Sequence, residues 1–100
     1  MANIAFSTPF TKSFTHVNAT VGTTAGEILA ATPNSYDRRV MLIIQNQHAA
    51  NTATVVFAAT GSAGIVLLPN QSISIENYNG PVRAVASGPT TPVHIAYSLV

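Results

Sequence analysis

Residues 38–46 read Arg-Arg-Val-Met-Leu-Ile-Ile-Gln-Asn, in which five consecutive apolar residues separate a charged start from an amide end. The valine and the two isoleucines are β-branched, and their restricted χ1 torsion favours an extended backbone. The apolar run is much shorter than the about 20 residues that a membrane-spanning helix requires. The stretch 45–51 that follows supplies no further turns of a helical apolar repeat. We therefore predict a strand buried on both faces, at the centre of a sheet.

This strand predicts a two-layer protein, because the face that its own sheet leaves open needs a second layer. Side chains alternate along a strand, so Val40, Leu42 and Ile44 are expected on one face and Met41 and Ile43 on the other. Further short runs with strand character are separated by turn residues, as in Pro69-Asn70 and Gly88-Pro89. We predict strands over residues 13–21, 27–31, 38–46, 52–59, 65–68, 71–78, 82–86 and 93–99.

Seven or eight short strands of this kind are typical of an all-β, antiparallel β-sandwich, here expected to be jelly-roll-like. One hundred residues correspond to a single domain spanning 1–100. No internal repeat and no linker divides the chain. The predicted fold class is therefore one all-β sandwich domain.

Asn79-Gly80 is the most specific local signal in the sequence. This dipeptide between two extended runs favours a two-residue type I′ hairpin, because both residues tolerate a positive φ. In such a hairpin Glu76 lies directly across from Arg83. An opposite-charge cross-strand pair contributes about 0.2–1 kcal/mol, so it would fix the register more than it would stabilise the fold.

Residues 1–12 are predicted to form an extended N-terminal arm. Pro9 breaks any helix, and phenylalanine recurs at Phe6, Phe10 and Phe14. Aromatic side chains on an arm need a surface on which to be buried. Two interpretations stay open: the aromatic side chains fold back on their own domain, or they dock, together with Lys12, on a neighbouring subunit.

The surface is expected to be almost uncharged, because charged residues make up 7% of the chain against about 25% in an ordinary soluble domain. Such a surface has little electrostatic penalty against being covered by another protein, although it also suits an ordinary neutral β-protein. Four scattered cations and a net charge of +1 give no basis for binding a run of phosphates. Neither a nucleic-acid partner nor a membrane partner is expected.

No catalytic, cofactor-binding or metal motif is found. The three carboxylates, Glu27, Asp37 and Glu76, are far apart in the sequence, and there is no cysteine. The three histidines are His16, His48 and His94, and none has a second His or a carboxylate two to four positions away. A metal site could therefore be assembled only by the fold. We predict that the protein is not an enzyme and uses no cofactor.

The start of the chain lacks the basic residues and long apolar core of a secretion signal, so synthesis in the cytoplasm is expected.

Three phrases carry a resemblance to a known family: residues 38–46, Gly64-Ile-Val-Leu, and Ser74-Ile-Glu-Asn-Tyr-Asn-Gly-Pro-Val-Arg-Ala-Val-Ala-Ser. Together they make the chain, over residues 38–100, resemble the small β-sandwich proteins that decorate or cement the capsids of tailed bacteriophages. The resemblance implies a virion protein on the outer surface of the phage head. It also implies a homotrimer that bridges adjacent subunits of the major capsid protein, its partner.

In that setting the arm with Phe6, Phe10 and Lys12 would grip a neighbour while the sandwich supplies rigidity. The alternative is a head-fibre or tail-associated sandwich that binds a glycan on the host surface. Exposed tyrosines, Tyr36 and Tyr78, could then stack on sugar rings, although tyrosines in loops more often serve the structure.

Overall fold

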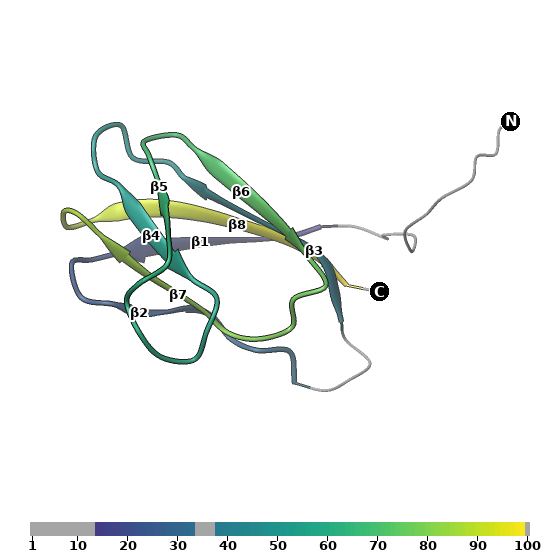
Figure 1. Ribbon diagram of the computed structural model, residues 1–100. Coiled ribbons are helices and arrows are strands. Elements are labelled where there is room, and N and C mark those ends of the chain that lie inside the picture. Colours follow the sequence, from purple (N-terminus) through teal and green to yellow (C-terminus); the bar gives the residue numbers. More distant parts are fainter. Residues whose placement is uncertain (1–13, 34–37, 100) are drawn as a thin grey trace, which may run out of the picture.

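The computed structural model describes residues 14–33 and 38–99, and within these ranges the protein is all-β (Figure 1). Eight antiparallel strands form two four-stranded sheets. The described residues include no helix that is long and apolar enough to cross a membrane. The strands are β1 (Thr15–Val21), β2 (Gly26–Leu29), β3 (Arg39–Asn46), β4 (Ala53–Val56), β5 (Ile65–Leu67), β6 (Ser72–Glu76), β7 (Val82–Ala86) and β8 (Thr91–Leu99).

The strand order is β1-β8-β3-β6 in one sheet, sheet A, and β2-β7-β4-β5 in the other, sheet B. Strands from opposite ends of the chain are neighbours: β1 pairs with β8, β2 with β7, β3 with β6, and β4 with β5. The start of β1 and the end of β8 therefore lie at the same end of the molecule, since Thr15 is opposite Tyr97 (Figure 1). Successive strands mostly alternate between the two sheets, which places most of the connecting loops at the two ends.

The two sheets face each other across one apolar core. Leu42, Ile44 and Ile95 of sheet A and Val55 and Val82 of sheet B are completely buried in it. Each such side chain contributes about 1.5–3 kcal/mol relative to an exposed one. This confirms the prediction of a two-layer all-β protein and the inward orientation of Leu42 and Ile44.

The outer face of β3 differs from the prediction of burial on both faces. Met41 and Ile43 are only half-buried. Their partners on β8, Ser98 and Ala96, are buried, whereas Ser74 on β6 and His16 on β1, which share that face of sheet A, are exposed. The predicted alternation is also interrupted between Arg39 and Met41 by a bulge in the pairing with β8. Apolar character on both sides of a strand therefore did not mean equal burial, because in a two-layer protein each sheet has one face at the surface.

The predicted hairpin at Asn79-Gly80 is wrong. The strand before it, β6, belongs to sheet A, and the strand after it, β7, belongs to sheet B, so residues 77–81 connect the two sheets. The residue with positive φ is Asn77, at 57°, which allows the chain to bend sharply as it leaves β6. Local turn chemistry was overruled because Ile73 and Ile75 pair with Ile44 and Leu42 of β3.

The predicted cross-strand pair of Glu76 and Arg83 is wrong for the same reason. Glu76 lies opposite Met41 in sheet A, whereas Arg83 lies opposite Glu27 and Val56 in sheet B. The Arg83 guanidinium donates instead to the carbonyl oxygens of Gly61 and Ala25, at 3.1 and 3.3 Å. By contrast, the Pro69-Asn70 turn is confirmed. The Gln71 N–H donates to the Leu68 carbonyl at 2.9 Å, and Asn70 has a φ of 65°.

Candidate functional site

Arg39 is a cation buried at one end of the molecule. It is 2% exposed, and its guanidinium donates to the carbonyl oxygen of Gly80 at 2.9 Å and to that of Ala30. Its Cζ lies 5.5 Å from the centre of the Tyr97 ring. Burial lowers the pKa of Arg39, and the nearby Tyr97 and Tyr78 partly oppose that shift. Arg39 thus joins the loop after β2, the 77–81 connection and β8 at one point.

The sequence did not predict this role. In sequence, Arg38 and Arg39 are only the charged start of the predicted strand, and charges at a strand end usually discourage edge pairing. Arg38 is exposed and fits that expectation, but Arg39 is held inside by the loop that was predicted to form a hairpin. The Asn79 Oδ1 accepts the backbone N–H of Arg39 at 2.8 Å, and its backbone carbonyl accepts the N–H of Thr32 at 3.0 Å. Asn79 and Gly80 therefore supply hydrogen-bond acceptors to Arg39 and Thr32 rather than the turn of a hairpin.

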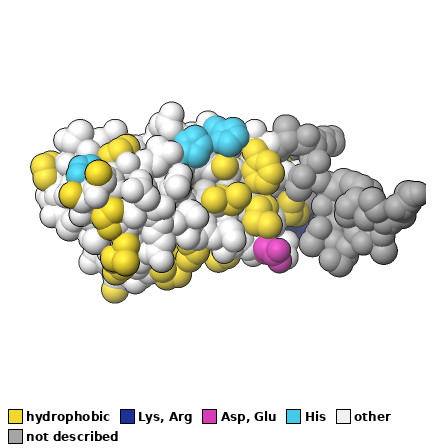
Figure 2. Space-filling model, turned by 90° about the horizontal axis from the view of Figure 1, so that it is seen from above, with side chains coloured by type: hydrophobic (Ala, Val, Ile, Leu, Met, Phe, Trp, Pro, Cys, Tyr) yellow, Lys and Arg dark blue, Asp and Glu magenta, His cyan; other side chains and the backbone are white. Residues whose placement is uncertain are grey.

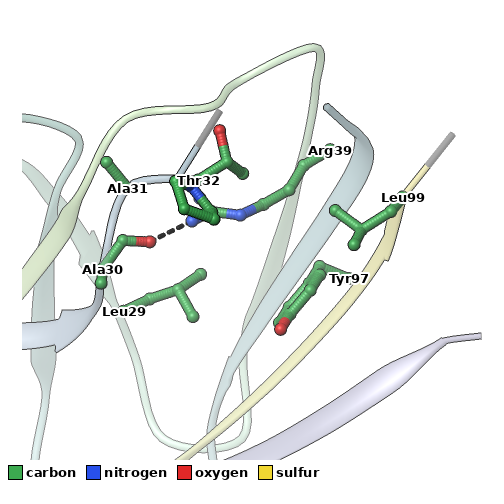
Figure 3. Close-up of a pocket in the computed structure, with 8 residues that line it drawn as sticks. Leu29, Ala30, Ala31, Thr32, Arg39, Tyr97 and Leu99 are labelled. Atoms are coloured by element: carbon green, nitrogen blue, oxygen red, sulfur yellow. Dashed lines mark hydrogen bonds between the residues drawn. The ribbon is translucent and has the colours of Figure 1, made fainter. Parts of the chain in front are cut away.

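A hollow of about 320 Å³ lies beside Arg39 (Figure 3). Its walls are mostly aliphatic. They come from the end of β2 and the loop that follows, and from β3 and β8, and the lining side chains with polar groups are Thr32, Arg39 and Tyr97. The lining residues are Leu29, Ala30, Ala31, Thr32, Pro33, Arg39, Tyr97 and Leu99. Because Thr15 pairs with Tyr97, the segment that precedes β1 begins at this end of the molecule.

A second unusual feature, besides the buried Arg39, is a group of exposed apolar side chains on β5, one of the two edge strands of sheet B. Ile65, Val66 and Leu68 are 46%, 53% and 56% exposed, while Leu67 between them is 2% exposed and packs in the core. We call these three exposed residues the β5 patch. They are three of the four exposed large apolar side chains among residues 14–33 and 38–99, the fourth being Phe14. Side chains alternate along a strand, so Val66 lies on the outer face of sheet B, whereas Ile65 is on the side of Leu67 and pairs with the buried Val55. Scattered exposed apolar residues need no explanation, but a concentration of them on one edge strand indicates an interaction surface.

The β5 patch continues over the outer face of sheet B. Val66 lies opposite Thr54 of β4, which in turn lies opposite Val85 of β7, and paired residues of an antiparallel sheet share a face. Thr54 and Val85 are half-buried. The uncharged surface therefore crosses three strands rather than ending at the edge.

The other three sheet edges carry devices that discourage association. The β2 edge has Glu27 and an irregular register, and the β6 edge has the exposed Glu76. The β1 edge exposes polar side chains such as His16 and Asn18. Charges and bulges on an edge strand oppose pairing with other chains. The β1 edge has neither a charge nor a bulge, but its exposed side chains are polar. Among the described edges, β5 is the one whose exposed side chains are apolar, and only its short length limits pairing.

The residues predicted to bind a partner are not placed by the structure. Phe6, Phe10 and Lys12 lie outside the described residues, as does Tyr36. Tyr78 is half-buried and donates its hydroxyl to the Pro81 carbonyl at 2.6 Å. Its ring meets the Phe57 ring edge-on at 5.4 Å. Tyr78 is therefore a packed residue, and a sugar ring does not have free access to it.

Sequence reasoning missed the exposure of the β5 patch, although it predicted the strand. The signal was present in Gly64-Ile-Val-Leu-Leu-Pro-Asn, a run of four apolar residues without a charge. Such a run looks the same in a central and in an edge strand. Only the strand order shows that β5 is an edge.

The fold can be compared with known proteins. No protein-family model matches the chain, and no curated protein matches it. A solved structure of a chain from Bacillus endospore appendages, which form a novel family of disulfide-linked pili, matches with a TM-score of 0.57 and 19% identity. The match covers 99% of this chain and 100% of that chain. At this identity the likeness shows a shared fold and no more.

Proposed function

We propose that the protein is a structural subunit of a large assembly, and that it decorates and stabilises a phage capsid by bridging major capsid protein subunits. The observation that carries the proposal is the β5 patch, which concentrates exposed apolar surface on an edge strand without charges. A surface of this kind is suited to being covered by another protein. The resemblance of residues 38–100 to capsid decoration proteins supports the choice of a capsid as the partner.

The β5 patch is too small to hold a complex by itself. Each of its three side chains is about half exposed, so covering the remainder contributes about 1 kcal/mol per residue. Association costs an estimated 4–15 kcal/mol in lost translational and rotational freedom. Binding therefore requires several contacts made together, which a homotrimer with additional arms would provide through effective concentration.

The second contact in our proposal is the extended N-terminal arm, residues 1–12, with Phe6, Phe10 and Lys12 gripping a neighbour. The hollow beside Arg39 supports this role because its aliphatic walls and the Tyr97 ring suit an aromatic side chain. It lies at the end of the molecule where the chain enters β1. Phe10 is four residues from Phe14, and an extended chain spans up to about 3.5 Å per residue, so an extended arm could carry Phe10 up to about 14 Å from Phe14.

The proposal includes a jelly-roll fold for the domain. In support, the strand order 1-8-3-6 and 2-7-4-5 is that of a long hairpin of four nested strand pairs folded into two sheets. Double-sheet jelly rolls of eight strands occur in viral capsid and lectin domains. A rigid sandwich of this type could brace a shell whose subunits are under strain, because buried contact area is added only in the assembled state.

A second candidate is a subunit that polymerises with copies of itself, which the fold shared with the endospore appendage chain favours. Disulfide linkage like that of those pili is not open to this sequence, because its 100 residues contain no cysteine. The glycan-binding alternative has less support, since Tyr78 is engaged by Pro81 and Phe57.

One experiment separates the three functions. The full-length protein is mixed with expanded capsids of a tailed bacteriophage that carry no decoration protein, with bacterial cells, or with neither, and each mixture is examined by sedimentation and electron microscopy. We expect binding to the capsids, which would place the protein on the outer surface of the virion. Fibres formed by the protein alone would support the second candidate, and binding to cells would support the glycan-binding module; either result without capsid binding contradicts our proposal.

The arm is tested by deleting residues 2–12. We expect the truncated protein to keep its circular dichroism spectrum and thermal transition, because β1 begins at Thr15, and to lose capsid binding. Undiminished binding would contradict the role of the arm while leaving the β5 patch as the contact.

A further inference from the structure

Two imidazoles lie side by side on one face of the molecule (Figure 2). They belong to His16 on β1 and His94 on β8, whose ring centres are 5.0 Å apart. The His16 Nδ1 is 2.8 Å from the His94 Nε2. The fold creates this pair, because 78 positions separate the two histidines in the sequence.

A third side chain fixes how the pair shares its protons. The His94 Nδ1 is 2.7 Å from the Oδ1 of Asn18, the residue directly opposite His94 on β1. Because a carbonyl oxygen only accepts, Nδ1 of His94 carries the proton and Nε2 presents its lone pair toward His16. The His16 Nδ1 then donates to that lone pair. One proton thus lies between two nitrogens that are both able to bind a metal.

We propose that His16 and His94 form a binding site for a divalent transition-metal ion of the kind that imidazole prefers, with Cu²⁺ favoured over Zn²⁺ by the general order of divalent-metal affinities. With metal–nitrogen bonds of about 2.0–2.1 Å, two adjacent ligands are about 2.9 Å apart in a tetragonal site and about 3.4 Å apart in a tetrahedral one. The observed 2.8 Å is a hydrogen-bond distance, and it brings the two nitrogens close enough to bind one ion once the rings turn. The neutral His16 ring carries one proton, so this proton moves from Nδ1 to Nε2 by exchange with water, and the ion binds the freed lone pair of Nδ1 together with that of the His94 Nε2. Both rings stay neutral, and no net proton is released.

The surroundings allow this exchange. His16 is exposed and His94 is half-buried, so both rings can turn until their lone pairs meet at one ion. Asn18 acts as the positioning residue, because a metal-binding histidine usually donates its other N–H to an oxygen that orients the ring. No group of three or more His, Cys, Asp or Glu is gathered anywhere in the described ranges. The remaining coordination positions are therefore left to water or to a second copy of the chain.

His48 provides a matched control within the chain. Its Nδ1 accepts the backbone N–H groups of Ala50 and Asn51 at 2.9 and 2.8 Å, so this ring serves a loop and has one nitrogen left. A His48→Gln variant therefore removes one imidazole without touching the proposed site.

The test is a titration of the full-length protein with CuSO₄, NiCl₂ and ZnCl₂, followed by calorimetry and by the NMR signals of the three histidine rings. We expect one ion per chain, with shifts confined to His16 and His94 and with tighter binding of Cu²⁺ than of Zn²⁺. His16→Gln or His94→Gln should abolish this site, and Asn18→Ala should weaken it by about 10- to 100-fold. Affinity should fall as the pH is lowered, because protons compete for the same nitrogens.

The proposal is overturned if His16→Gln and His94→Gln bind the ions as the unmodified protein does, or if His48→Gln removes the binding. Thermal unfolding of each variant in the absence of metal shows whether a loss of binding results from misfolding. Because both histidines are on an outer sheet face, the variants are expected to keep their transition within the range of ordinary surface substitutions, about 0.5 kcal/mol.

Discussion

Arg39 and the β5 patch are both exceptions to the usual rule of burial: Arg39 is a charged residue that is buried, and the β5 patch consists of apolar residues that are exposed. A guanidinium is 2% exposed at one end of the molecule, and Val66 is 53% exposed on a sheet edge. The burial of Arg39 is explained inside the chain, by the carbonyl oxygens of Gly80 and Ala30 and by the Tyr97 ring. The exposure of the β5 patch has no such internal explanation. The difference separates a residue that serves folding from residues that point to a partner.

The largest effect on this comparison is expected from Arg39→Met, which keeps much of the side-chain volume and removes the donors. The carbonyl oxygens of Gly80 and Ala30, which accept part-buried hydrogen bonds, then lose their partner. A fully buried acceptor left without a partner costs about 1–3 kcal/mol, so the cost here is expected toward the low end for each. We expect the free energy of unfolding in urea to fall by about 2–3 kcal/mol. The matched control is Arg38→Met at the exposed neighbouring position, which should change stability by no more than about 0.5 kcal/mol. Equal effects of the two variants would show that Arg39 does not hold the end of the molecule together.

Substitutions in the β5 patch should weaken binding rather than stability, in contrast to Arg39→Met. The double variant Val66→Lys and Leu68→Lys places two charges on exposed positions, so the free energy of unfolding should change little. Binding to capsids should weaken by at least about tenfold, because a charge that becomes buried and unpaired at an interface is costly. Ser62→Lys, on an exposed loop residue, is the control. Full binding by the double variant would remove the β5 patch from the account.

A smaller effect is expected at Tyr78, which joins the Arg39 end to the core. Burial raises the pKa of Tyr78, and the positive charge of Arg39 partly offsets this. A raised pKa in the folded state means that this contribution to stability is complete below about pH 10, the ordinary tyrosine value, and is lost as the pH rises above it through the folded value. Tyr78→Phe should cost about 1 kcal/mol at neutral pH through the lost hydrogen bond to Pro81. Unfolding curves from pH 8 to 11 should then show a shallower alkaline loss in Tyr78→Phe than in the unmodified protein.

The smallest effect concerns Glu76 and Arg83, which lie in different sheets. Glu76→Ala and Arg83→Ala should be additive to within about 0.5 kcal/mol in a double-mutant cycle. Arg83→Ala alone should have the larger effect, because its guanidinium donates to Gly61 and Ala25. A coupling energy well above that limit would show that Glu76 and Arg83 interact directly, which the strand order excludes.

Strand positions were largely predictable from the sequence, because alternation and β-branched runs report the local backbone. The runs around Leu42, Ile73 and Ile95 all form strands at about the expected places. Strand pairing was not predictable, since Asn79-Gly80 favours a local hairpin whereas the apolar face of β6 packs against β3 from a distant part of the chain.

The candidate functional surfaces could not be predicted from the sequence, because they too depend on which strands pair. Val66 is exposed only because β5 is an edge strand, and His16 meets His94 only because β1 pairs with β8. Arg39 looked like a solvated strand end, and its burial depends on the bulge in β3 and on acceptors from two loops. All three depend on contacts between residues far apart in the sequence, which periodicity does not encode.

The central claim is that the β5 patch is covered when the protein takes its place in an assembly. The chain contains no cysteine, so a single thiol at Val66→Cys, with Ser62→Cys as its reference, can be labelled with a maleimide in the free protein and after binding to capsids. The account predicts that Val66→Cys reacts in the free protein and is protected in the bound state, while Ser62→Cys reacts in both. Equal labelling of Val66→Cys in the two states would contradict it.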